Sequence, residues 1–207
     1  MSKTAGNVVD PLELVDEYGV ECLRYYVLAE IAYGSDGNFT YEGMVSRYNS
    51  DLANNLGNLA ARIATVVEKK CAGRGTAPSQ DSVLATAAAK AVAETSQAWS
   101  NVQPSRALEA TWGLIRAANS YLEQNEPWKM EPGTEVDRVM GDALEALRII
   151  AILANPALPT ATQIIWERIG LTGDITDSRI NVDTIWGQYP TGRVVTKGEP
   201  LFPRKSV

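Results

Sequence analysis

Apolar positions recur every three or four residues along most of this chain, which is the spacing of one face of an α-helix. The clearest example runs from Thr40 through "YEGMVSRYNSDLANNLGNLAARIATVVEKK". Its apolar stripe consists of Leu52, Leu56, Leu59, Ile63, Val66 and Val67. We therefore predict one long helix over this stretch.

Two short helices are predicted before the long one. In "DPLELVDEYG", Asp10 is a suitable N-cap, Pro11 occupies the first helical position and Gly19 ends the helix. The next stretch, "VECLRYYVLAEIA", has apolar residues at helical spacing, and the turn-rich "YGSDGNFT" interrupts the pattern.

After the long helix, the pattern predicts helices over 81–99, 105–124 and 136–154, and another within "NPALPTATQIIWERIG". From Gly170 onward, short apolar stretches predict brief strands or extended arms. The fold class is therefore all-α: a helical bundle of about five principal helices. We divide the chain into an entry segment (1–38), the bundle (39–170) and a C-terminal tail that packs back on the core (171–207).

Composition narrows the functional classes. The chain has 207 residues, is 45% hydrophobic and 21% charged, and has no apolar run long enough to cross a membrane. Its polar N-terminus is unlike a signal peptide, so we expect a cytoplasmic protein with no membrane partner. The absence of histidine excludes Ser-His-Asp and Cys-His catalysis and histidine-based metal sites in this sequence. The cysteines, Cys22 and Cys71, lack metal-ligand spacing, and we expect no metal site and two reduced thiols.

The net charge of −6 disfavours a protein that coats nucleic acid non-specifically, because phosphate neutralisation supplies most of that affinity. Acidic pairs such as Asp16–Glu17 and Asp137 with Asp142 are interpreted as solvated helix faces. The tryptophans other than Trp128 are assigned to packing. Any nucleic-acid site in this chain is expected to be small and directed at bases.

Three groups of residues are candidates for chemistry or binding. The opening "MSKTAG" places Lys3 beside Ser2, where a mobile ammonium can meet phosphate oxygens, although a solvated tail is the alternative. "GNLAAR" places Asn58 and Arg62 four residues apart on one helix face, which suits reading a base edge or a routine polar stripe.

The third group is "NEPWK", in the predicted loop before residue 136. Trp128, held after Pro127, can stack on a base, and such stacking contributes about 1–3 kcal/mol. Alternatively, the ring closes the end of the bundle.

The order of these segments resembles the C-terminal part of methionyl-tRNA synthetases, a family of class I aminoacyl-tRNA synthetases. "MSKTAGNVVDP" is similar to the KMSKS loop and the residues that follow it, and "YGVECLRYYVLAE…SDGNFTYEGMVSRYNSDLANNLGNLAAR" is similar to the next family segment. "NEPWK" resembles the anticodon-binding tryptophan loop, "LANPALPTATQI" the start of the last bundle helix, and "GEPLFPRK" the end of the conserved core.

This resemblance implies roles for the candidates. Lys3 matches the second lysine of the loop, which acts on the ATP phosphates, and Ser2 lies in the same loop. Asn58, Arg62 and Trp128 match the family's readers of the CAU anticodon. Pro127 would hold the tryptophan loop rigid.

Further expectations concern the whole enzyme. The implied cofactor is ATP, with Mg²⁺, and the implied partners are the tRNA(Met) anticodon arm and an N-terminal catalytic half. The loop's first lysine and the HIGH signature are not found in this sequence, and Thr4 replaces the loop's usual last serine. We therefore expect the chain alone to be inactive and to bind no cofactor, but to retain weak anticodon binding. Separately, we expect it to be a monomer. A stand-alone tRNA-binding module and an inactive helical fragment remain alternatives.

Overall fold

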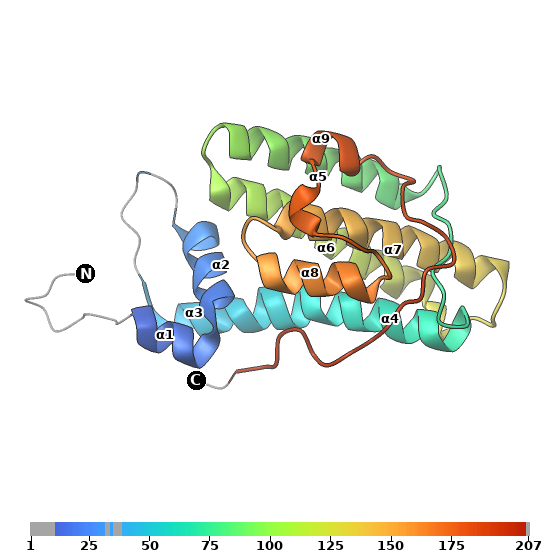
Figure 1. Cartoon of the computed structure of the whole chain (residues 1–207), viewed down its shortest axis with the longest axis horizontal. Helices are drawn as coiled ribbons and strands as arrows, with labels where there is room; N and C mark the ends of the chain where they lie inside the picture. The colour runs from blue at the N-terminus through green and yellow to red at the C-terminus, as the bar shows by residue number, and fades with distance from the viewer. Residues whose placement is uncertain (1–10, 32–33, 35–38, 206–207) are drawn as a thin grey trace, which may run out of the picture.

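The computed structural model describes residues 11–31, 34 and 39–205, and these form an all-α fold (Figure 1). The described part of the chain contains no β-strand, only a single bridge between Arg74 and Val194. The predicted fold class is confirmed. Asp10, the predicted cap of the first helix, lies outside the described residues.

The entry segment forms the predicted pair of short helices, α1 (Pro11–Tyr18) and α2 (Val20–Glu30). Gly19 separates them with a φ of 86°, a left-handed conformation that glycine adopts without steric cost. The next helix, α3 (Tyr41–Arg47), begins after Thr40, whose hydroxyl accepts a hydrogen bond from the backbone N–H of Gly43.

The predicted long helix is continuous but not uniformly α-helical. Between α3 and α4 (Asn58–Lys70) lies a π-helical segment, η1 (Tyr48–Gly57), which the periodicity did not predict. At its end the N–H of Asn58 reaches back five residues to the carbonyl of Ala53. Trp112 and Asn119, both on the neighbouring α6, donate side-chain hydrogen bonds to carbonyls within η1. These contacts fix the wide turns that precede the candidate residue Asn58.

The remaining helices form the bundle: α5 (Val83–Ser100), α6 (Pro104–Asn125), α7 (Thr134–Ala154) and α8 (Pro159–Arg168). α5 and α6 form a helical hairpin, while α7 packs against α4, α5, α6 and α8 (Figure 1). From residue 139 to residue 154 every residue of α7 is buried, including the charged residues Asp142, Glu145 and Arg148. The observed bounds lie within two residues of the predicted ones for these three longer helices.

The tail contains a short 3₁₀ turn, η3 (Ile175–Asp177), and α9 (Ile180–Asp183), and is otherwise extended. The predicted extended arms are present, but the predicted brief strands are not, because the tail binds mainly to side chains. Gly187 and Gln188 donate their backbone N–H groups to the buried carboxylate of Glu145 at 2.7 and 3.0 Å. From there the tail runs back along the bundle to the end that carries α1 (Figure 1).

Candidate nucleic-acid interface

The loop after α6 places the candidate tryptophan. α6 ends at Asn125, and Glu126 adopts a left-handed conformation with φ 47° and ψ 50°. Pro127, which is buried, then begins the single 3₁₀ turn η2 (Pro127–Lys129), and the fixed φ of proline suits this first position. This turn packs against α4 and α7. It leaves the Trp128 side chain 40% exposed, so the ring does not simply close the end of the bundle.

Asn58 and Arg62 lie one turn apart at the start of α4, on the face beside its buried apolar stripe. The Arg62 guanidinium carbon lies 4.9 Å from the centre of the Trp128 ring, in the range of a cation–π contact. A guanidinium nitrogen of Arg62 also lies 3.5 Å from the carboxylate of Glu123. The structure therefore brings together three candidates that come from two segments 66 residues apart (Trp128 minus Arg62).

These side chains border a pocket of about 420 Å³. Its lining consists of Asn58, Ala61, Arg62, Thr65, Val66, Trp128 and Lys197. Such a pocket offers an aromatic face, an apolar floor, an amide that both donates and accepts, and a guanidinium that only donates. This combination suits a flat, polar-edged ring such as a nucleobase.

Sequence reasoning missed four of the lining residues. Ala61 and Thr65 could have been found, because they continue the helical spacing of Asn58 and Arg62 along the same face. Val66 was assigned to the apolar stripe and also forms part of the pocket. Nothing in the sequence around Lys197 indicates that it lines the pocket, since it is brought there only by the course of the folded tail.

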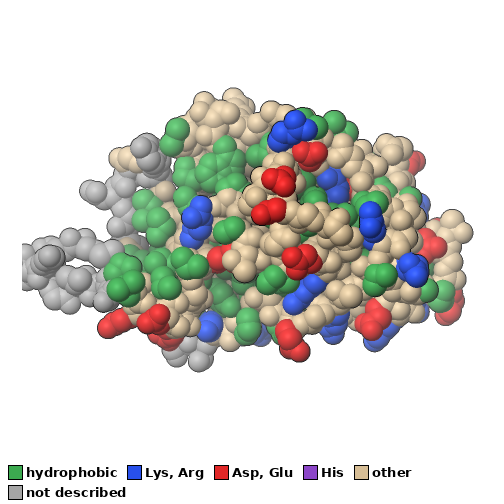
Figure 2. Space-filling model, in the orientation of Figure 1, with side chains coloured by type: hydrophobic (Ala, Val, Ile, Leu, Met, Phe, Trp, Pro, Cys, Tyr) green, Lys and Arg blue, Asp and Glu red, His purple; other side chains and the backbone are tan. Residues whose placement is uncertain are grey.

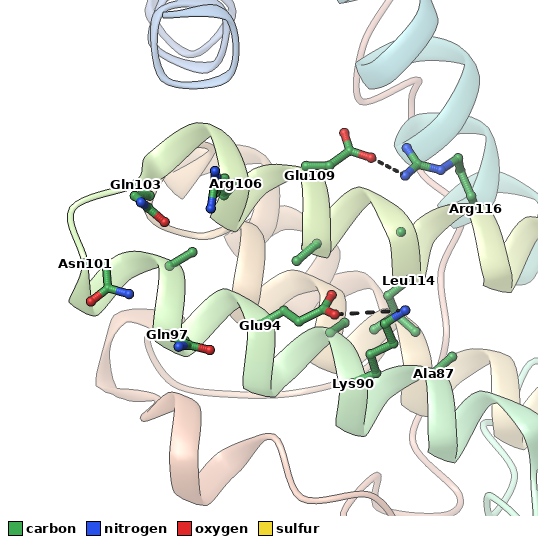
Figure 3. Close-up of a pocket in the computed structure, with 14 residues that line it drawn as sticks. Ala87, Lys90, Glu94, Gln97, Asn101, Gln103, Arg106, Glu109, Leu114 and Arg116 are labelled. Carbon is green, nitrogen blue, oxygen red and sulfur yellow. Dashed lines mark hydrogen bonds and ion pairs between the residues drawn. The ribbon is translucent and has the colours of Figure 1, made fainter. Parts of the chain in front are cut away.

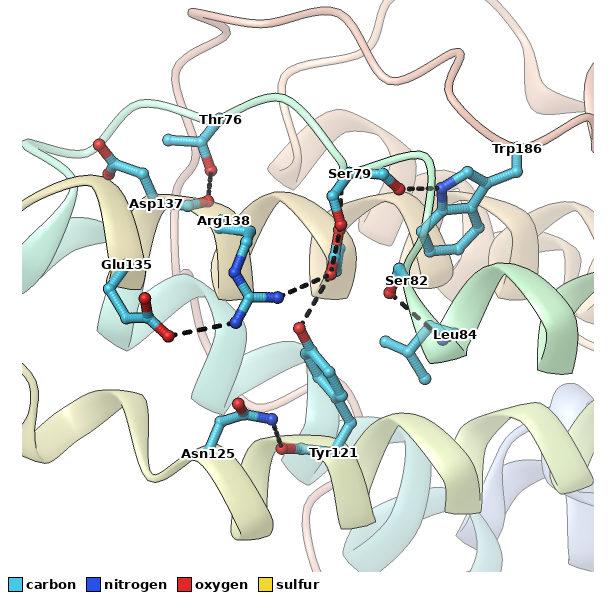
Figure 4. Close-up of polar contacts among 11 residues, drawn as sticks. Thr76, Ser79, Ser82, Leu84, Tyr121, Asn125, Glu135, Asp137, Arg138 and Trp186 are labelled. Atoms are coloured by element: carbon cyan, nitrogen blue, oxygen red, sulfur yellow. Dashed lines mark hydrogen bonds and ion pairs between the residues drawn. The ribbon is translucent and has the colours of Figure 1, made fainter.

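The burial of the Asp142 carboxylate corrects its interpretation as part of a solvated face. Ser79 and Tyr121, which both bond to it, are labelled in Figure 4. Asp142 is completely buried and accepts hydrogen bonds from the Ser79 N–H at 2.7 Å and the Tyr121 hydroxyl at 2.8 Å. Burial, followed by this bond to Asp142, raises the pKa of Tyr121. The carboxylate thus joins the 71–82 loop, α6 and α7 near the end of α6 that carries Trp128. The pair Asp16–Glu17 is exposed, as predicted.

A larger hollow of about 760 Å³ lies elsewhere, on the outer side of the α5–α6 hairpin (Figure 3). Its basic side chains alternate with acidic ones, and Arg116 pairs with Glu109 at 2.6 Å while Lys90 lies 3.9 Å from Glu94. None of the candidates within the described residues, Asn58, Arg62, Pro127 and Trp128, lines it. It offers neither a stacking surface nor a uniform charge for nucleic acid.

The face of the molecule drawn in Figure 2 also favours a small, local site. Over the face seen in Figure 2, Lys and Arg side chains are interspersed with Asp and Glu and do not gather into one basic patch. Ser2 and Lys3 lie outside the described residues. Among the described residues, no group of three or more His, Cys, Asp or Glu side chains is arranged to hold a metal ion, and no helix is long and apolar enough to cross a membrane.

A helical bundle that presents an aromatic, an amide and a guanidinium around one pocket fits the class of tRNA anticodon-binding domains. Residues 72–206 match the family described as "Anticodon binding domain of methionyl tRNA ligase", and residues 1–64 match "tRNA synthetases class I (M)". The chain belongs to the methionyl-tRNA ligase family.

Two relatives and two solved structures illustrate the match. The methionine–tRNA ligases of Enterococcus faecalis and Bacillus subtilis are each 39% identical to this chain over 100% and 99% of its length, and the matched region is 32% of each relative. The Mycobacterium tuberculosis methionyl-tRNA synthetase bound to methionyl-adenylate has a TM-score of 0.86 at 30% identity, covering 98% of this chain and 41% of that one. Its apo form has a TM-score of 0.84 at 28% identity, covering 97% and 42%. The chain thus spans about a third of the length of the curated relatives it matches.

Proposed function

We propose that this chain binds the anticodon arm of tRNA(Met) and recognises its CAU anticodon in the pocket beside Trp128. The observation that carries the proposal is the meeting of Asn58, Arg62 and Trp128 around one pocket. Sequence-specific RNA recognition uses unstacked loop bases, which stack on aromatic rings and bond through their edges.

Each residue has a distinct role in this proposal. Trp128 stacks on the first anticodon base, cytosine, while the Asn58 amide and the Arg62 guanidinium bond the edges of that base and its neighbours. Pro127 keeps the 3₁₀ turn rigid, so little conformational entropy is lost when the base stacks. Glu123 lies 3.5 Å from the Arg62 guanidinium, but this exposed pair is weak and leaves the guanidinium free to bond RNA.

The remaining part of the proposal concerns the complete ligase. There Lys3 and Ser2, within the region matched to class I (M) synthetases, would act with a catalytic half on the phosphates of ATP, with Mg²⁺, during methionine activation. The chain alone is proposed to be a cytoplasmic monomer. It is expected to show no methionine-dependent ATP–pyrophosphate exchange, because the HIGH signature requires histidine and this sequence has none.

The proposal is tested by fluorescence anisotropy of labelled anticodon stem-loops titrated with the 207-residue chain. One loop carries CAU and three others carry a single changed anticodon base each. We expect the CAU loop to bind most tightly, and Asn58→Ala and Arg62→Ala to reduce that preference by about 1–3 kcal/mol each, the usual contribution of a good bidentate base contact. Equal affinity for all four loops would contradict anticodon recognition by this chain.

A further inference from the structure

Lys197 borders two hollows at once. It lines the pocket beside Trp128, and it lines a second, narrower hollow together with Arg168 and the inner side of α4. Within residues 171–205, the lysine is the only contribution of the C-terminal tail to the lining of the Trp128 pocket. Its position is therefore set by how the tail crosses the bundle.

The backbone on the N-terminal side of Lys197 is firmly held. The N–H of Thr196 donates to the carbonyl of Arg168 at 2.8 Å, and the N–H of Val195 donates to the carbonyl of Gly73 at 3.0 Å. The Val195 side chain is buried in the core. These bonds fix where the lysine stem begins and leave only its own rotamers free.

The residue after Lys197 also requires a close approach. Gly198 has a φ of 62°, and a Cβ atom built on it would lie 2.6 Å from the guanidinium carbon of Arg168. The tail thus passes directly over the Arg168 side chain at this point. Arg168 lines the second hollow, and its guanidinium has no ion pair among the described residues.

The cations in and near the pocket differ in whether an acidic side chain pairs with them. Arg62 lies 3.5 Å from Glu123, and Lys129 lies 2.7 Å from Glu126. Lys197 is exposed, and its ammonium has no ion pair or hydrogen bond within residues 11–31, 34 and 39–205. In a chain of net charge −6, an uncompensated cation at the rim of a base-sized pocket is placed to attract an anion locally.

We infer that Lys197 binds a backbone phosphate next to the base that stacks on Trp128; this inference rests on the proposed anticodon recognition. A lysine ammonium is a point charge with three donors on a flexible stem, which suits a phosphate whose exact position varies between loops. Phosphate contacts of this kind position RNA without reading its sequence. The C-terminal tail then contributes binding energy, while α4 and η2 contribute base recognition.

The test compares the wild-type chain with Lys197→Ala, Lys197→Arg and Lys90→Ala. Lys90 lies on α5 in the other hollow, so its removal is the same charge change at a distance. Each protein is titrated with the CAU loop and with a loop changed at the first anticodon base, from 0.05 to 1 M salt. A second series replaces one phosphate at a time around the first anticodon base with a neutral methylphosphonate.

Lys197→Ala is expected to reduce the affinity for both loops by the same factor. That factor should be about fivefold larger at 0.1 M salt than at 1 M salt, because losing one phosphate contact to a single strand changes the slope of log affinity against log salt by about 0.7. Lys197→Arg should restore the slope, and Lys90→Ala should leave it unchanged. One methylphosphonate position should weaken the wild type but not Lys197→Ala. Since the lysine side chain is exposed, thermal melts of the variants should match the wild type.

Three results would overturn the inference. They are unchanged affinity and slope in Lys197→Ala, a loss confined to the CAU loop, and methylphosphonate losses that are the same in both proteins. If Trp128→Ala still loses CAU affinity in those cases, only the phosphate contact is wrong. If the wild-type chain binds neither loop, the proposed function fails and the inference fails with it.

Discussion

The buried carboxylate of Asp142 gives a sharp prediction about stability. It is fully buried in α7 and accepts hydrogen bonds from the Ser79 N–H at 2.7 Å, the Ser79 hydroxyl at 3.1 Å and the Tyr121 hydroxyl at 2.8 Å. A guanidinium nitrogen of Arg138 lies 4.0 Å away. Replacing Asp142 with alanine leaves the buried Tyr121 hydroxyl and the half-buried Ser79 groups without their acceptor.

The magnitude follows from the groups left unpaired. Hydrogen bonds to a charged group contribute about 1.5–3 kcal/mol each, and removing one member of a buried charged network typically costs about 3–5 kcal/mol. We therefore expect Asp142→Ala to lower the free energy of unfolding by about 3–5 kcal/mol. For a chain of this size, 1 kcal/mol shifts Tm by about 2–4 °C, so Tm should fall by about 6–20 °C.

Urea titration followed by circular dichroism measures the effect, with two comparison variants. Asp16→Ala removes the same side chain from an exposed position on α1 and should change the unfolding free energy by less than about 0.5 kcal/mol. Tyr121→Phe removes only one of the donors, and its cost should be smaller in the Asp142→Ala background, where the hydroxyl has already lost its acceptor. Equal stability of Asp142→Ala and Asp16→Ala would refute the reasoning.

Three further predictions concern the pocket and the thiols. Trp128→Ala should weaken binding of the CAU stem-loop by about 5- to 150-fold, the equivalent of about 1–3 kcal/mol of lost stacking, whereas Trp128→Phe should retain most of the affinity. Anisotropy titration measures both, and an unchanged dissociation constant in the alanine variant would count against stacking. Glu123→Gln should increase the affinity for the same stem-loop by up to about fivefold, because the exposed ion pair with Arg62 is weak and the Glu123 carboxylate repels phosphate. Weaker binding would contradict this and would mean that the ion pair is needed to place the Arg62 guanidinium. Burial raises the pKa of the Cys22 thiol to about 11 and that of the Cys71 thiol, which is also next to Asp137, to about 12, both from 9.0. Burial of the neutral thiols therefore contributes stability that is complete below pH 9 and is lost as the pH rises through 11 to 12. The difference between the unfolding free energies at pH 8 and pH 10 should be smaller in a Cys22→Ala/Cys71→Ala variant than in the wild type. An identical difference in the two proteins would contradict this.

The helices were predictable because each has its own apolar periodicity and its own capping or helix-ending residues. Gly19 and Thr40 mark ends that the structure confirms, and the long helices of the bundle were predicted to within two residues. The π-helical segment was not, since its wide turns depend on hydrogen bonds from Trp112 and Asn119 across the bundle. No local pattern in η1 itself indicates those partners.

The candidate site was predictable in part for the same reason. Asn58 and Arg62 share a helix face by spacing alone, but the sequence does not show that this face meets Trp128. The position of Lys197 follows from how the tail bonds to Arg168 and Gly73. The burial of Asp142 follows from how the 71–82 loop crosses α7, where a Cβ atom at Gly141 would lie 2.1 Å from the carbonyl oxygen of Ala77. Such contacts join distant segments and leave no period in the sequence.

The central claim is that Trp128 stacks on the first anticodon base, and a thermodynamic cycle between that residue and that base tests it most directly. Four dissociation constants are needed, for the wild type and Trp128→Ala, each with the CAU stem-loop and with a loop that is abasic at the first anticodon position. If the ring and the base stack, the abasic loop should bind the wild type about 1–3 kcal/mol more weakly and should bind Trp128→Ala no more weakly than the CAU loop does. Losses that simply add in the doubly altered complex would show that Trp128 and the first base do not interact.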